Sequence, residues 1–148
     1  MYSKDNYTVL LFSMRVGKQG LPLLFKCFNG IREPDAFTDV TICNCIKTVS
    51  NYFKDTNFNL VFLADRWFNS EAILSTIKEL NHTFCIKIKS NLKVRIFDNK
   101  ENHCIYKYTG DLTGKKYMGK YYNDVYLFEN STFKTNIVIS KYNGIDEP

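Results

Sequence analysis

The run FNLVFLAD, from Phe58 to Asp65, constrains the fold more than any other part of the sequence. A short, continuous apolar run of this kind is typical of a central strand that is covered on both faces. Asn69 or Ser70 follows as a candidate N-cap for a helix, with Glu71 placed favourably in its first turn. The segment therefore predicts a strand that ends on a carboxylate, at the edge where α/β folds usually place their sites.

The rest of the first 91 residues predicts a mixed α/β unit. Apolar and β-branched residues predict a hairpin whose first strand is largely buried, and helical spacing of apolar residues predicts a helix capped by Thr38 or Asp39. The expected elements are strand 7–17, turn 18–20, strand 21–30, helix 38–55, strand 58–65, a helix after residue 70, and strand 82–91.

The character of the sequence changes after Asn91. Seven of the ten tyrosines fall between Tyr106 and Tyr142, and no helical period survives. We expect residues 92–148 to form an antiparallel β-rich segment attached to the α/β unit of residues 1–91. The tyrosines could stack on nucleic-acid bases, although alternating aromatic residues in strands more often pack. The predicted strands are LKVRIFD, CIYKYTG, KKYMGKYY, DVYLFEN and FKTNIVISKY.

The composition restricts the classes of possible binding partner only slightly. The formal net charge of +5 favours polyanions mildly, because many enzymes without a nucleic-acid role carry as much. The five cysteines have no framework spacing and, with His82 and His103, form no zinc-site pattern, so they are interpreted as reduced, buried thiols of a cytosolic protein. No apolar run approaches the ~18 residues of a membrane span, so we expect a soluble chain without a membrane partner.

Three segments together resemble the DDE transposases of bacterial insertion sequences. Members of that family carry an apolar strand ending in A-D-R-x-[FY] and a later strand ending in R-[LI]-K-x-N; here the corresponding segments are LADRWFNSEAI and FCIKIKSNLKV. They also carry G-x-x-L-P-L after a strand, to which the segment Gly20-Leu21-Pro22-Leu23-Leu24 corresponds. The resemblance covers Tyr7 to about Val94, and the tyrosine-rich remainder is similar to the β-strand insertion of some members.

This resemblance implies an RNase H-like core in which three acids, Asp, Asp and Glu, hold two Mg²⁺ ions for DNA cleavage and strand transfer. Only the second Asp maps onto this sequence, as Asp65. The first would precede Met1, with Asp5 a poor substitute, and the Tyr-Arg-Glu-Lys pattern of the final Glu does not occur, so neither Glu129 nor Glu147 takes that role. We therefore expect a transposase fragment that is inactive alone, with Asp65 as a catalytic residue and Mg²⁺ ligand of the complete enzyme.

The resemblance also implies double-stranded DNA as partner, at transposon ends and target, a homo-oligomer in the complete enzyme, and the bacterial cytoplasm as location. A fragment without its first strand should expose apolar surface between Tyr7 and Phe12. Basic residues after the predicted strand 82–91 can neutralise phosphates and make binding salt-dependent. The candidate nucleic-acid-binding residues are Arg66, Lys87, Lys89, Asn91 and Lys93, with Arg95 beyond them.

Simpler explanations remain open for each of these residues. Asp65 could merely cap the next helix or pair with Arg66, and Asp35 and Asp39 are expected to be solvated or capping. Lys87 and Lys89 could form a solvated face that guards a strand edge. Trp67 and Phe68 are expected in the core or as helix-staple residues. The alternative function is a non-catalytic module that binds protein or single-stranded nucleic acid, and a complete small nuclease is the least supported.

Overall fold

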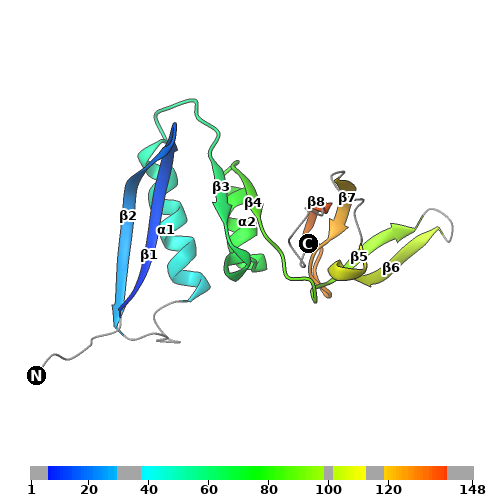
Figure 1. The fold of residues 1–148 in the computed structure, drawn as a ribbon. Coiled ribbons are helices and arrows are strands. Elements are labelled where there is room, and N and C mark those ends of the chain that lie inside the picture. Colours follow the sequence, from blue (N-terminus) through cyan, green and yellow to red (C-terminus); the bar gives the residue numbers. More distant parts are fainter. Residues whose placement is uncertain (1–6, 30–37, 99–101, 113–118, 140–148) are drawn as a thin grey trace, which may run out of the picture. The chain divides into compact units, whose positions relative to one another are not determined.

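The structure, a computed structural model, describes residues 7–29, 38–98, 102–112 and 119–139. It is a mixed α+β fold whose elements follow the expected order (Figure 1). The chain divides into two compact units. The first unit comprises residues 1–63 and 72–85, and the second comprises residues 64–71 and 86–148. No helix in the described part of the chain is long and apolar enough to cross a membrane.

The first unit begins with a hairpin of β1 (Tyr7–Val16) and β2 (Gln19–Asn29). The predicted turn at residues 18–20 is wrong, because Val16 pairs with Gln19 across a two-residue turn. Gly17 has a φ of +63°, which the first position of a type II′ hairpin turn requires and which a residue with a side chain rarely adopts. Pro22 lies where the register shifts, at a bulge that tolerates its missing N–H group.

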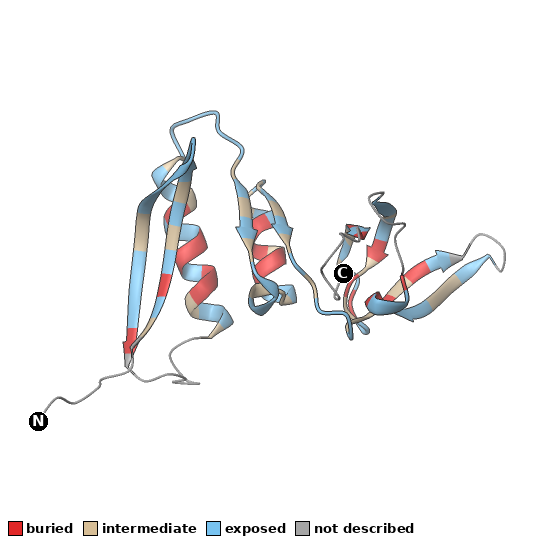
Figure 2. Ribbon diagram, viewed as in Figure 1, coloured by how far each residue is buried: buried red, intermediate tan, exposed pale blue. Residues whose placement is uncertain are grey.

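Helix α1 (Asp39–Tyr52) follows residues 30–37, which lie outside the described residues, and runs beside the hairpin (Figure 1). Thr38 is its N-cap, because the Thr38 hydroxyl accepts a hydrogen bond from the Thr41 backbone N–H. The apolar face of α1 is buried, whereas the hairpin is much more open than predicted, with Val9 and Leu11 more than half exposed (Figure 2). The expectation of a largely buried first strand is therefore wrong. Between Tyr7 and Phe12, Val9 and Leu11 are exposed, whereas Leu10 is buried.

Strands β3 (Val61–Ala64) and β4 (Thr83–Ile86) pair on either side of helix α2 (Glu71–Glu79) in sequence. The backbone N–H of Thr83 donates to Leu60 O and that of Lys87 donates to Ala64 O, so both partners advance by the same step and the strands are parallel. β3 was expected to be covered on both faces, but Val61 and Leu63 are 59% and 67% exposed. One face of β3 is therefore open to solvent.

A single turn of 3-10 helix, η1 (Arg66–Phe68), separates β3 from α2 and was not expected from the sequence. Asn69 does not cap α2, because its Oδ1 is buried without a hydrogen-bond partner; Ser70 directly precedes the helix. His82 lies before β4, where its Nδ1 accepts from the Leu60 N–H and its Nε2 therefore donates to the Ser50 hydroxyl, 2.8 Å away. This histidine thus has a structural role.

The second unit contains a four-stranded antiparallel sheet in the order β6-β5-β7-β8. KKYMGKYY and DVYLFEN were expected as separate strands, but residues from both form the single strand β7, which bulges near Asp124 at a φ of +53°. One face of the sheet is buried, with Val94 and Val125 at 0% exposure (Figure 2). The strands are β5 (Lys93–Asp98), β6 (His103–Tyr108), β7 (Lys120–Tyr126) and β8 (Lys134–Ile139), with a 3-10 turn, η2 (Thr109–Asp111), after β6.

Candidate metal-binding and nucleic-acid-binding residues

Asp65 lies at the C-terminal end of β3 and immediately precedes η1. Its backbone is extended, and its Oδ1 accepts a hydrogen bond from the backbone N–H of Arg66 at 2.5 Å. Asp65 therefore caps η1, as the simpler explanation of this residue requires. The residue is also exposed, and a carboxylate has about four acceptor positions, so capping leaves oxygen lone pairs directed at solvent.

The oxygen ligands that Asp65 and its sequence neighbours offer suit at most one hydrated cation. The buried Oδ1 of Asn69 is an orphaned oxygen acceptor on the same short segment. Among the described residues, no three His, Cys, Asp or Glu side chains gather into a group that could hold a metal ion. Mg²⁺ is usually held by one or two carboxylates together with water and substrate phosphates. One carboxylate does not supply the ligands of a two-metal centre.

Of the other candidate acids, the two that the structure describes have separate roles. Asp39 occupies the first turn of α1, where a negative charge is favourable against the helix dipole. Glu129 is engaged by Lys93 on the four-stranded sheet. Asp5, Asp35 and Glu147 lie outside the described residues.

Trp67 is 71% exposed, so the expectation that it belongs to the core or a helix staple is wrong; Phe68 is half-buried. The ammonium group of Lys89 lies 5.3 Å from the centre of the Trp67 ring, within cation–π range. Both residues belong to the second unit, as do Asp65 and Arg66. The structure thus places an accessible indole beside a cation, one residue after the Asp65–Arg66 pair.

Lys87, Lys89 and Asn91 are exposed, but they do not lie on a strand, because β4 ends at Ile86. The backbone N–H of Lys87 donates a hydrogen bond to Ala64 O at the end of β3. After this point the chain that forms β3 continues into η1. The following segment is held instead by the Thr109 hydroxyl, which donates to the Lys89 carbonyl oxygen. The predicted strand 82–91 is therefore too long, although the alternation of exposed and half-buried residues continues through Lys89.

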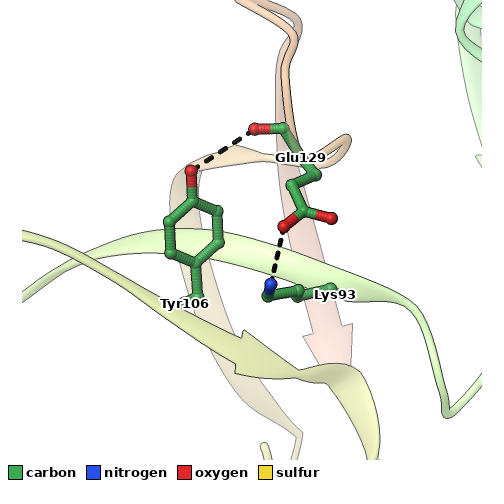
Figure 3. A network of polar contacts seen from close by, with 3 residues as sticks. All are labelled: Lys93, Tyr106 and Glu129. Atoms are coloured by element: carbon green, nitrogen blue, oxygen red, sulfur yellow. Dashed lines mark hydrogen bonds and ion pairs between the residues drawn. The ribbon is translucent and has the colours of Figure 1, made fainter.

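Lys93 is already paired. Its Nζ lies 2.6 Å from Oε1 of Glu129 and 4.9 Å from the centre of the Tyr106 ring (Figure 3). The hydrogen bond and the charge of Glu129 raise the pKa of Lys93 above its ordinary value of 10.5. Any phosphate that contacts Lys93 must therefore compete with the Glu129 carboxylate.

A row of side chains whose alignment is not apparent from the sequence crosses all four strands of the sheet. Tyr106 is the register partner of Arg95, Arg95 is the partner of Tyr126, and Tyr126 is the partner of Lys134. Directly paired residues project from the same face of a sheet. The Arg95 guanidinium carbon lies 4.0 Å from the Tyr126 ring centre, and Lys134 Nζ lies 4.8 Å from that centre. Aromatic rings and cations therefore alternate across this face.

The neighbouring pair Lys93 and Tyr108 extends this face along the strands. Tyr106 and Tyr108 are 47% and 52% exposed, so the expectation that the tyrosines pack is wrong for these two residues. A surface depression of about 250 Å³ adjoins them, lined by Lys93, Tyr106, Lys107, Tyr108 and Asp111. The alternation of residues within β5 and β6 is visible in the sequence, but the pairing of the strands is not.

These accessible polar and aromatic residues thus form two sets. One lies around Asp65 and Trp67, and the other lies on the four-stranded sheet. Compared with known proteins, the chain matches no protein-family model, no curated protein and no solved structure.

Proposed function

We propose that this chain is part of a DNA transposase of the DDE type, with Asp65 as the second acid of its catalytic centre. The observation that carries the proposal is the position of Asp65 at the C-terminal end of β3, which is parallel to β4 and joined to it through α2. Strand ends of such β–α–β units are where α/β folds place reactive groups. The A-D-R-W-F sequence adds the resemblance to the family.

The order of the secondary-structure elements supports the proposal of an RNase H-like core. A hairpin, a helix and a parallel β–α–β unit follow one another, as expected for such a core after its first strand. The exposed side chains of Val9 and Leu11 on the hairpin and of Val61 and Leu63 on β3 form apolar surface that a further element of the core could cover.

The proposed activity belongs to a complete catalytic centre. Two Mg²⁺ ions need several converging carboxylates, and the described residues contain no group of three or more His, Cys, Asp or Glu side chains that could hold a metal ion. In the complete enzyme Asp65 would be one Mg²⁺ ligand, and exposed Lys87 and Lys89 would contact the backbone of double-stranded DNA. The 148 residues alone are expected to show no cleavage or strand transfer.

The chain contains one tryptophan, which makes the metal proposal directly measurable. Tb³⁺ is a hard cation that prefers oxygen ligands, and excitation of Trp67 should sensitise its emission when it binds at Asp65. Asp65→Asn should abolish the signal, Mg²⁺ should compete for it, and Asp55→Asn, which changes an exposed acid of the other unit, should leave it intact. Equal emission from the wild-type chain and Asp65→Asn would contradict metal binding at Asp65.

Two further observations test the wider proposal. The nucleotide sequence on both sides of this reading frame should encode an upstream Asp and a downstream Glu between inverted repeats; their absence would count against a transposase. Incubation of the chain with labelled DNA and Mn²⁺ should give no cleavage. Robust cleavage that disappears in Asp65→Asn would show that the three-acid assignment is wrong.

A further inference from the structure

One face of the sheet β6-β5-β7-β8 carries aromatic rings and cationic side chains, whereas the opposite face packs into the hydrophobic core. Val94 and Val125 alternate with Arg95 and Tyr126 along β5 and β7, so the buried and accessible faces are distinct. We call the accessible set the tyrosine face. It consists of Lys93, Arg95, Tyr106, Tyr108, Tyr126 and Lys134.

We propose that the tyrosine face binds single-stranded nucleic acid, with bases stacked on Tyr106 and Tyr108 and phosphates near Arg95 and Lys134. Neighbouring strands lie about 4.8 Å apart, so the row from Tyr106 to Lys134 spans roughly 14 Å, enough for a few nucleotides. Surfaces that bind single strands without sequence preference combine basic grooves with aromatic stacking platforms. The tyrosine face has both components.

The charges on this face favour a polyanion. Three cations, Lys93, Arg95 and Lys134, project from it, and Glu129 neutralises the first of them. The buried Nε of Arg95 has no hydrogen-bond partner within the described residues, which leaves a donor unsatisfied. Such an atom costs free energy unless a bound acceptor reaches the guanidinium group or its surroundings rearrange. A phosphate oxygen is a suitable acceptor.

The exposed rings favour a single strand over a duplex. About half of the Tyr106 and Tyr108 side chains is accessible, beside the 250 Å³ depression between them and Asp111. Unpaired bases can place a π-face on such a ring, whereas the bases of a duplex are already stacked on one another. An acidic peptide would use the same cations but would gain nothing from the aromatic character of Tyr108.

The test measures fluorescence anisotropy of a labelled oligothymidylate of roughly 12 nucleotides, within the site sizes of small β-sheet modules. The wild-type chain should bind, and a duplex of the same length should compete poorly. Tyr108→Leu should weaken binding about tenfold, as expected for the loss of one stacked base. Tyr108→Phe, which keeps the ring, should bind as the wild type does.

Tyr52→Leu provides a matched control, because Tyr52 is 53% exposed but lies on α1 in the other unit. It should leave the affinity unchanged. Asp65→Asn should also have no effect, so failure of this proposal and failure of the metal proposal are distinguishable. The tyrosine face is refuted as a single-strand site if the oligothymidylate does not bind, if Tyr108→Leu binds as tightly as wild type, or if the duplex competes equally well.

Discussion

The segment around Asp65 and the tyrosine face differ in how they are recognised, the first by its local sequence and the second by its strand pairing. Asp65 is proposed as a Mg²⁺ ligand from its local sequence and its position at the end of β3, yet the described residues contain no group of three or more His, Cys, Asp or Glu side chains that could hold a metal ion. The tyrosine face has no recognisable motif, yet strand register aligns Tyr106, Arg95, Tyr126 and Lys134 in one row. A motif thus indicates a type of chemistry, whereas a surface built by strand pairing becomes visible only once the pairing is known.

The two regions also differ in how they are supported. Strand β3, which leads to Asp65, exposes Val61 and Leu63, whereas the sheet beneath the tyrosine face has residues that are completely buried. Buried apolar area is the main favourable contribution to stability. The tyrosine face therefore rests on a packed core within the second unit.

The largest expected effect is on the free energy of unfolding, and two valines of the same sheet test the packing beneath the tyrosine face. Val125→Ala, at 0% exposure on β7, should lower the free energy of unfolding by about 2–3 kcal/mol, because it removes buried methyl groups and leaves a cavity. Val138→Ala, at 62% exposure on β8, should cost less than about 1 kcal/mol, the span of β-propensity differences. Urea denaturation of both variants measures the difference, and equal losses would contradict the assignment of buried and accessible faces.

Local sequence signals were sufficient for most elements. The β-hairpin and the two helices follow the predicted order, as do β5, β6 and β8 of the C-terminal sheet, and Thr38 caps α1 as expected. These features depend on alternation, helical period and capping side chains within a few residues of each other. Of the candidate site, the exposure of Asp65, Lys87 and Lys89 was also foreseeable, because a strand end and charged residues favour solvent.

Features that depend on distant partners were missed. The run from Phe58 to Asp65 is apolar enough for a doubly covered strand, but whether both faces are covered depends on what packs there, and Val61 and Leu63 are exposed. Strand 82–91 ends early because β3 supplies no carbonyl beyond Ala64. The expectation of five buried cysteines holds for Cys43 and Cys45 but is wrong for Cys27 and Cys85, which are exposed. These errors in predicted burial thus arise from tertiary packing, which a local sequence pattern does not specify.

A second prediction concerns the DNA contacts proposed beside Asp65. Lys87→Gln combined with Lys89→Gln should weaken duplex binding roughly five- to tenfold at low salt, because two phosphate contacts are lost. The slope of log affinity against log salt should fall by about 0.9 for each lysine removed. Since Lys89 lies over the Trp67 ring, Trp67 fluorescence should report duplex binding in the wild-type chain.

Lys47→Gln combined with Lys120→Gln removes the same charge from exposed positions on α1 and β7, so it serves as the control. It should change the affinity little and leave the salt slope nearly intact. If both double variants behave alike, the net charge of +5 alone explains duplex binding, and the segment after β4 has no particular role.

The smallest expected effect has the opposite sign and concerns the tyrosine face. Glu129→Gln should tighten oligothymidylate binding about two- to threefold, because it frees Lys93 from a surface ion pair and removes a negative charge near the phosphates. Glu79→Gln removes the same charge from an exposed position at the end of α2 and should leave the affinity unchanged. An equal gain in both variants would indicate a general charge effect.

The raised pKa of Lys93 fixes the pH range in which this comparison is valid. Glu129 stabilises the protonated amine, so the contribution of the ion pair is fully present below the ordinary lysine pKa of 10.5 and is lost only as the pH rises through the raised value. Lys93 therefore remains charged at neutral and mildly alkaline pH, whether Glu129 or a phosphate is its partner. The gain from Glu129→Gln should accordingly be the same at pH values of about 7 and 9. A gain that disappears across that interval would show that a group other than Lys93 controls binding to the tyrosine face.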